Sequence, residues 1–248
     1  MNMNTMIKNM RRAVIVGASS GLGREVALLL LADGWQCGVA ARRADKLAEL
    51  ENAFPEQVTT AAIDVTAIDA EEQLTRLVED LGGMDLYFHA AGIGWQNRDL
   101  NADKELATVE TNALGFTRLV GAAYRYMATH GGGHIAVISS IAGVKGLGPA
   151  PAYSATKALQ NTYIQALEQQ AHARGLNIRF TDIRPGFVDT ALLAGDKYPM
   201  MLKPEAVARQ IVRAIKSRRH VAVIDLRWRV LTAMWRRVPR WIWRRLKL

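Results

Sequence analysis

Short apolar runs alternate with longer amphipathic stretches through most of the chain. The runs at residues 13–16 and 134–138 are rich in valine and isoleucine and predict buried strands. The stretch at residues 21–32, which follows the first run, has the spacing of an amphipathic helix. Strands that alternate with helices in this way predict a parallel sheet covered by helices on both faces.

This alternation continues to about residue 224 without an internal repeat or a low-complexity linker. The predicted strands cover residues 13–16, 36–41, 59–63, 84–88, 134–138, 177–183 and 220–224. The predicted helices cover residues 21–32, 44–53, 103–129, 152–174 and 204–216. We therefore expect one α/β domain over residues 1–225, followed by a distinct segment over residues 226–248.

A glycine-rich turn joins the first strand to the first helix, with the sequence Gly17-Ala18-Ser19-Ser20-Gly21-Leu22-Gly23. Such a turn lets the backbone approach a phosphate, and the helix N-terminus offers free N–H groups and positive dipole. The alternative is a plain strand-to-helix turn. A nucleoside-triphosphate P-loop is disfavoured, because Arg24 and Glu25 follow where that motif has lysine and a hydroxyl residue.

The ends of the second and third strands carry the next polar candidates. In dinucleotide-binding folds an acid after the second strand binds the ribose hydroxyls, whereas an arginine accommodates a 2′-phosphate. Here Ala41 stands where the acid is expected and Arg42-Arg43 follow, which favours NADP(H) over NAD(H). Alternatively both arginines only begin a solvated helix. Asp64, after the third strand, either contacts the adenine or caps the following helix.

A second group of residues suggests proton transfer. The strand at residues 134–138 ends in Ser139-Ser140, and Tyr153 and Lys157 share one face of the following helix. A phenol beside an ammonium is expected to have a lowered pKa, since the positive charge favours the phenolate. Asn112 lies inside a predicted helix, where asparagine is unfavourable, so its amide either turns inward at a kink or faces solvent.

Taken together, these motifs resemble the short-chain dehydrogenase/reductase family over residues 12–223. The matches are the Gly17-Gly21-Gly23 pattern, Asp64, Asn112, Ser140, the Tyr153–Lys157 pair, and Pro185-Gly186 with Thr190. The resemblance implies a Rossmann-like, doubly wound parallel sheet of about seven strands. It also implies that further residues contact the cofactor: Ser19, Ser20, Leu22, Arg42, Arg43, Val65, Ala90, Ala91, Gly92 and Val188.

The chain departs from the family pattern at two places. Val16-Gly17 replaces the commoner Thr-Gly, and His89-Ala90-Ala91-Gly92 stands where the family has Asn-Ala-Gly. His89 is therefore near the position at which an asparagine usually braces the sheet. It either replaces that structural hydrogen bond or transfers protons.

The resemblance implies an oxidoreductase in which hydride passes between NADP(H) and a carbonyl or secondary alcohol. Tyr153 would protonate the alkoxide, Lys157 would lower the pKa of Tyr153 and hold the nicotinamide ribose, and Ser140 would polarise the carbonyl. Asn112 would hold a water that relays protons toward Lys157. Relatives commonly form homodimers or tetramers through the helices that carry Asn112 and Tyr153.

A different class of function is a non-catalytic NADP-binding scaffold or sensor on the same fold, because a fold does not fix a function. The intact catalytic residues argue against it. Residues 191–203 correspond to the family's lid over the substrate, and include Leu192, Leu193, Tyr198 and Met200. This apolar content indicates either an apolar substrate or packing on the body or a partner.

The C-terminal segment carries most of the net charge of +9. From Leu226 to Leu248 the chain has basic residues but no acidic one, and the rest is near neutral. On a helical wheel Leu231, Met234, Trp235, Val238, Trp241 and Ile242 share one side, opposite the arginines. Three partners are possible for this segment. It either lies on an anionic membrane surface, packs on the body or across an oligomer interface, or contacts nucleic acid, although no nucleic-acid-binding motif is present. Pro239 should interrupt the helix.

Other classes of protein are excluded by what the sequence lacks. A single cysteine, Cys37, excludes a disulfide framework, and the five histidines show no metal-ligand spacing, so no metal is predicted. Neither a signal-peptide pattern nor an apolar run of about 18 residues is present. We expect a cytoplasmic protein, with the tail as a peripheral contact to the inner face of a membrane as the alternative location.

Overall fold

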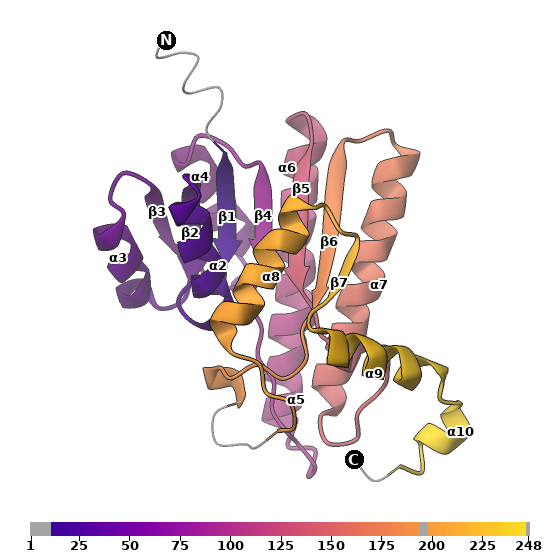
Figure 1. The fold of residues 1–248 in the computed structure, drawn as a ribbon. Coiled ribbons are helices and arrows are strands. Elements are labelled where there is room, and N and C mark those ends of the chain that lie inside the picture. Colours follow the sequence, from indigo (N-terminus) through magenta and orange to yellow (C-terminus); the bar gives the residue numbers. More distant parts are fainter. Residues whose placement is uncertain (1–10, 194–197, 247–248) are drawn as a thin grey trace.

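A computed structural model describes residues 11–193 and 198–246 of the chain, which form a seven-stranded sheet (Figure 1). The strands are β1 (Arg12–Val16), β2 (Gln36–Ala41), β3 (Val58–Ala62), β4 (Leu86–His89), β5 (Gly133–Ile138), β6 (Ile178–Arg184) and β7 (Val221–Val223). Their order is β3-β2-β1-β4-β5-β6-β7, and every neighbouring pair is parallel. The predicted doubly wound sheet is confirmed.

Helices cover both faces of this sheet. They are α2 (Gly21–Ala32), α3 (Ala44–Ala53), α4 (Ala70–Asp80), α5 (Ala102–Val109), α6 (Phe116–Thr129), α7 (Pro151–Ala173) and α8 (Pro204–Lys216). Helices α2, α3 and α8 share one apolar core with the sheet, and α2 and α8 lie side by side (Figure 1). Helices α4, α6 and α7 share the second core on the opposite face. Both faces of each central strand are therefore buried, as their continuous apolar sequences require.

The order of the strands reverses between β1 and β4. From β1 the chain proceeds to β2 and β3 on one side, and then crosses to β4 and continues to β7 on the other. In such a sheet a crevice opens at the carboxyl ends of the strands beside this reversal, and ligands bind there. The loops after β1, β4, β5 and β6 meet at this edge.

The C-terminal segment forms two further helices, α9 (Leu226–Arg237) and the short α10 (Arg240–Trp243). The helix breaks at Val238 and Pro239, as predicted, because proline cannot donate the backbone hydrogen bond that a continuous helix needs. Trp228 at the start of α9 is 1% exposed, so this part of the segment is built into the body. The division of the chain into domains at residue 225 stays a prediction.

Two properties of the described residues limit the classes of site. Within residues 11–193 and 198–246, no helix is long and apolar enough to cross a bilayer. Over the same ranges no group of three or more His, Cys, Asp or Glu side chains could hold a metal ion.

Candidate active site

A cavity of about 970 Å³ opens at the carboxyl edge of the sheet. It brings together all but one of the predicted site residues: Gly17, Ser19, Ser20, Gly21, Leu22, Gly23, Arg42, Arg43, Asp64, Val65, Ala90, Ala91, Gly92, Ser140, Tyr153, Lys157, Pro185, Gly186, Val188 and Thr190. Asn112 does not line it, because its side chain is fully buried beneath the loop after β4.

The turn after β1 approaches the neighbouring loop so closely that one glycine is required. Gly17 has a φ of +94°, and a Cβ at this position would lie 2.5 Å from the backbone nitrogen of Ala91. The turn leads directly into α2, whose N-cap residue Ser20 makes no side-chain cap hydrogen bond. The first N–H groups of α2 are therefore not capped by Ser20 and can bind an anion.

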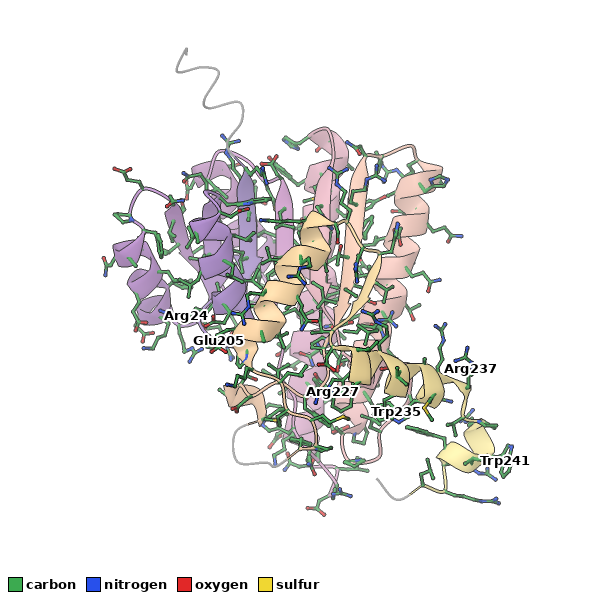
Figure 2. The ribbon with its side chains drawn as sticks, in the orientation of Figure 1. Arg24, Glu205, Arg227, Trp235, Arg237 and Trp241 are labelled. Carbon is green, nitrogen blue, oxygen red and sulfur yellow. The ribbon has the colours of Figure 1, made fainter. Side chains whose placement is uncertain are left out.

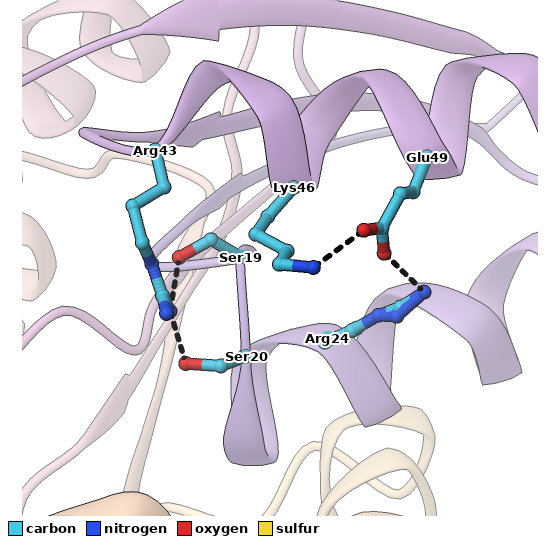
Figure 3. A network of polar contacts seen from close by, with 6 residues as sticks. All are labelled: Ser19, Ser20, Arg24, Arg43, Lys46 and Glu49. Carbon is cyan, nitrogen blue, oxygen red and sulfur yellow. Dashed lines mark hydrogen bonds and ion pairs between the residues drawn. The ribbon is translucent and has the colours of Figure 1, made fainter.

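A basic side chain crosses the glycine-rich turn from the end of β2. Arg43 Nη2 donates hydrogen bonds to the hydroxyls of Ser19 (3.0 Å) and Ser20 (2.7 Å), as Figure 3 shows. Two other basic groups nearby, Arg24 and Lys46, are both paired with Glu49. Among the described residues no acidic side chain forms an ion pair with Arg43. Its positive charge is therefore uncompensated at the edge of the cavity.

Asp64 does not cap the following helix, so that alternative is wrong. Its carboxylate accepts hydrogen bonds from the backbone N–H (3.0 Å) and the hydroxyl (2.8 Å) of Thr66, while α4 begins only at Ala70. Burial opposes ionisation of Asp64, but these hydrogen bonds and the charge of Arg42 hold its pKa below the ordinary value. Asp64 thus stays a charged group on the cavity wall, close to Arg42.

The two serines after β5 have different partners. The hydroxyl of Ser139 donates to the carboxylate of Asp182, which is also bonded to Arg184 at 2.6 and 2.8 Å. The hydroxyl of Ser140 instead acts on Tyr153, where it offsets part of the rise in pKa that burial causes, and its oxygen accepts a hydrogen bond from the backbone N–H of Ala142 (3.1 Å). Ser140 is therefore the serine whose hydroxyl is directed to the Tyr153 phenol, as the sequence predicts.

The predicted lowering of the Tyr153 pKa is wrong for this arrangement. Burial raises the pKa of Tyr153, and the hydrogen bond with Ser140 offsets only part of that effect. Lys157 Nζ lies 5.7 Å from the centre of the Tyr153 ring and donates to Ile138 O and Gln160 Oε1, both at 3.0 Å. Burial also lowers the pKa of Lys157 to about 8, so this ammonium loses its proton far more easily than an exposed lysine.

Asn112 lies in a π-helical turn, Glu110–Gly115, that joins α5 to α6. Its Nδ2 donates to Ile93 O (2.6 Å) and its Oδ1 accepts from Ile93 N (2.9 Å). The inward-turned amide predicted from the sequence is confirmed. The expected continuous helix over residues 103–129 is replaced by three segments, because the π turn brings this amide to the loop after β4.

Gln160 is a site residue that the sequence analysis did not identify. It is fully buried, accepts from Lys157 Nζ and donates to the carbonyl oxygen of Asn112 (2.8 Å). It follows Tyr153 by seven positions and Lys157 by three, so all three share one face of α7. That spacing was the available signal, and the two hydrogen bonds show that Gln160 links Lys157 to the π turn.

His89 is a structural residue rather than a proton donor at neutral pH. It is fully buried, its Nδ1 is 2.9 Å from the Tyr87 hydroxyl, and its ring packs edge-on against Phe116. Burial and the nearby charge of Lys157 lower the pKa of His89 to about 3. The imidazole therefore remains neutral, and its bond to Tyr87 lies within strand β4.

Helix α9 provides a wall of the cavity that the sequence analysis also missed. Trp228, Leu231 and Trp235 line the same cavity as Tyr153. The Trp228 indole lies against the turn after β6, where a Cβ on Gly186 would be 2.3 Å from its Nε1. Packing on the body is thus confirmed for one face of α9, but the predicted wheel is partly wrong because Met234 and Trp241 are exposed.

Residues 198–202 of the segment predicted as a lid pack on the turn after β6. Phe187 stacks on Tyr198, with ring centres 4.2 Å apart, and meets Trp228 edge-on at 5.3 Å. Leu202 is buried, and its backbone bonds to Phe187 O and Asp189 N. Residues 194–197 of the predicted lid lie outside the described residues, as do residues 1–10 and 247–248.

Comparison with known proteins agrees with this geometry. The family model described as short chain dehydrogenase matches residues 11–198, and the chain belongs to that family of oxidoreductases. An uncharacterised oxidoreductase of Myxococcus xanthus is 36% identical over 196 residues, which cover 77% of each chain. One from Staphylococcus aureus is 30% identical over 220 residues, covering 86% of this chain and 94% of the relative.

A solved structure with the same fold is the alcohol dehydrogenase of the archaeon Thermococcus sibiricus, in complex with 5-hydroxy-NADP. It superposes with a TM-score of 0.78 at 26% identity, and the match covers 88% of this chain and 96% of the archaeal chain. These matches fix the family and the fold, while the substrate and the preferred cofactor depend on the residues of the site itself.

Proposed function

We propose that this protein is an NADP(H)-dependent oxidoreductase that interconverts a carbonyl and a secondary alcohol on an apolar molecule. The observation that carries this proposal is that Ser140, Tyr153 and Lys157 line one cavity whose walls include aromatic side chains. A hydroxyl pair of this kind can hold a substrate oxygen and exchange a proton with it.

The residues present fit a nicotinamide dinucleotide. The turn at Gly17 has no room for a side chain, α2 presents N–H groups that Ser20 does not cap, and Arg43 holds an uncompensated charge beside them. The adenosine end would lie between Arg43 and Asp64, and the nicotinamide end beside Pro185 and Gly186. When bound, this group supplies or accepts the hydride.

The chain's own residues perform the proton chemistry. Tyr153 gives a proton to the substrate oxygen as negative charge develops there, and takes it back in the reverse direction. Ser140 donates a hydrogen bond to the same oxygen. Lys157, with a pKa of about 8, is charged at neutral pH and can stabilise the phenolate that Tyr153 becomes. Gln160 and Asn112 position Lys157 through their buried hydrogen bonds.

The preference for NADP(H) has support that differs in detail from the sequence prediction. That prediction treated Arg42 and Arg43 together, but the two arginines have different surroundings. In the structure Arg42 lies near the charge of Asp64, whereas the described partners of the Arg43 guanidinium are the neutral hydroxyls of Ser19 and Ser20. We therefore assign Arg43 as the main ligand of the 2′-phosphate, with Ser19 and Ser20 as additional hydrogen-bond donors.

A homo-oligomer also forms part of the proposal. Helices α5 and α7 and the π turn between α5 and α6 expose large apolar side chains: Leu106, Val109, Leu114 and Leu159. Because α5 and α7 pack together, these side chains give an apolar face that suits a second copy of the chain. Light scattering during size-exclusion chromatography, with Leu159→Arg as the disrupting variant, tests this contact.

Turnover with matched variants tests the proposed reaction. Apolar ketones and secondary alcohols are screened by the change in NADPH absorbance, and NADPH binding is measured separately by energy transfer from tryptophan. Tyr153→Phe and Ser140→Ala should lose turnover but still bind NADPH. Ser139→Ala is the control, since its hydroxyl bonds to Asp182 instead. Near-normal turnover by Tyr153→Phe would refute the assignment, and NADPH binding without any turnover by the wild type would favour the scaffold alternative.

A further inference from the structure

Helix α9 has two different faces. The inner face consists of Trp228, Leu231, Thr232 and Trp235, which are buried or half-buried against the body. Trp228 contacts Phe187 and Trp235 edge-on, with ring centres 5.3 and 6.5 Å apart. This face is already covered, and it forms part of the cavity that contains Tyr153. The inner face of α9 is therefore not the surface that binds another macromolecule or a membrane.

The outer face of α9 is apolar as well, but no residue within 11–193 or 198–246 covers it. Leu226, Val230 and Met234 follow one another at intervals of four residues, and they are 67%, 54% and 61% exposed. Trp241 in α10 is a further exposed apolar side chain of the tail, with 59% exposure, and it lies at the far end of the C-terminal segment (Figure 2). Side chains of this size rarely form an exposed stripe without a partner.

Positive charge surrounds this outer stripe. Arginines flank it along α9 and α10 and are all exposed: Arg227, Arg229, Arg236, Arg237, Arg240, Arg244 and Arg245. Only Arg227 forms an ion pair among the described residues of this segment, with Asp225. No acidic residue follows Asp225 in the sequence. A partner of this face must therefore have both negative charge and an apolar region that can accept the exposed side chains.

Those two requirements select among the possible occupants. A second copy of the chain in a symmetric contact would place these arginines against the same arginines. A nucleic acid would satisfy the charge but would leave Leu226, Val230 and Met234 without apolar contact. An anionic lipid surface satisfies both, because its headgroups attract arginine and its acyl region accepts aliphatic and tryptophan side chains.

We propose that α9 and α10 bind an anionic membrane surface with the outer stripe, and that the inner face of α9 receives an apolar substrate from that membrane. The second part rests on the proposed function. Its basis is that a single helix carries both faces. Leu231 and Trp235 line the cavity on one side, while Val230 and Met234, adjacent to them in sequence, would lie in the lipid. The substrate class is thus a membrane-dissolved carbonyl or alcohol.

Co-sedimentation of the full chain with lipid vesicles tests the membrane contact. Phosphatidylcholine vesicles are compared with vesicles that also contain phosphatidylglycerol, at low and high salt. Wild type should bind the anionic vesicles and lose binding as salt increases. Arg229→Gln with Arg236→Gln should weaken binding by about thirtyfold, while Arg218→Gln with Arg219→Gln, two exposed arginines outside the tail, should change it less than about twofold.

The apolar stripe needs its own pair of variants. Val230→Gln with Met234→Gln should reduce anionic-vesicle binding by about tenfold or more, whereas Ile68→Gln, at a position 92% exposed outside the tail, should have no effect. Equal sedimentation with neutral and anionic vesicles, or equal losses in the control variants, would overturn the proposal. So would binding of duplex DNA that depends on the same arginines when no vesicle binding occurs.

Delivery of the substrate is tested by turnover. The Val230→Gln, Met234→Gln variant should keep wild-type rates with a water-soluble carbonyl and lose at least about tenfold with a carbonyl dissolved in anionic vesicles, in line with its weaker binding. Equal losses with both substrates would refute delivery from the membrane. If wild type reduces neither carbonyl while it still binds vesicles, the proposed function and the delivery step fail, and the lipid contact stands.

Discussion

Replacing Arg43 by alanine should separate the binding of NADPH from that of NADH. Arg43 Nη2 lies 2.7 and 3.0 Å from the hydroxyls of Ser20 and Ser19, on the wall of the cavity. Arg43 is exposed and forms no ion pair within the described part of the chain, so a 2′-phosphate would meet an uncompensated positive charge. NADH has no such phosphate. The substitution should therefore weaken NADPH binding and leave NADH binding nearly unchanged.

The size of this effect follows from the exposure of Arg43. Two unit charges about 4 Å apart interact by roughly 1 kcal/mol in water and roughly 4 kcal/mol at an effective dielectric constant of about 20. Because Arg43 is solvent-exposed, the interaction energy lies in the lower part of that range. The double charge of the phosphate increases this energy. A loss of about 1.5 to 2 kcal/mol is expected, which corresponds to about ten- to thirtyfold in the NADPH dissociation constant.

Calorimetric titration with both dinucleotides measures this effect without any substrate. Lys46→Ala is the matched control, because Lys46 is paired with Glu49 at 2.6 Å and should contribute less than about threefold. Raising the salt concentration should narrow the difference between NADPH and NADH in wild type but not in Arg43→Ala. The reasoning is refuted if wild type binds both dinucleotides equally, or if Arg43→Ala weakens both by the same factor.

Three further changes test the interior of the site. Burial lowers the pKa of Lys157 from 10.5 to about 8, so between pH 8 and pH 10.5 the unfolded chain binds more protons than the folded one. The free energy of unfolding should therefore rise by about 3 kcal/mol over this pH range. Urea unfolding measures this rise, which should be absent in Lys157→Met. Gly186→Ala should displace the Trp228 indole, cost about 1 to 3 kcal/mol and shift tryptophan fluorescence, whereas Gly148→Ala, with open space around its Cβ, should do neither. Asn112→Ala removes two buried hydrogen bonds to the loop after β4 and should cost about 2 to 4 kcal/mol in the same unfolding assay.

Much of the fold follows from the sequence because the signals at the element boundaries agree. Strand β2 and helices α3 and α8 have the predicted bounds, since each is flanked by a change of hydrophobic period and, for α8, by a proline in its first turn. The sequence left two alternatives for Asn112, an amide turned inward at a kink or one facing solvent. The structure decides for the first, because the amide bonds to Ile93.

The pKa of Tyr153 could not be predicted from its neighbours in sequence. The spacing of Tyr153 and Lys157 places them on one face of α7, and an ammonium near a phenol lowers its pKa. Both groups, however, are buried, and removing a charge from water opposes ionisation of each. Lys157 also directs its donors to Ile138 and Gln160, which the sequence spacing alone did not reveal. Burial is a property of the whole fold, so its effect appears only when the fold is known.

The two faces of the C-terminal helix α9 also could not be predicted from the sequence alone. Periodicity identified α9 as amphipathic, and its arginines identified the charge of a possible partner. A helical wheel assigns one apolar face, yet this helix has two, because Trp228 and Trp235 pack inward while Leu226, Val230 and Met234 remain outside. The inner face could be separated from the outer one only by knowing where the turn at Gly186 lies. Since residues with similar hydrophobicity occupy both faces, a variant of the outer face alone can distinguish lipid binding from damage to the cavity.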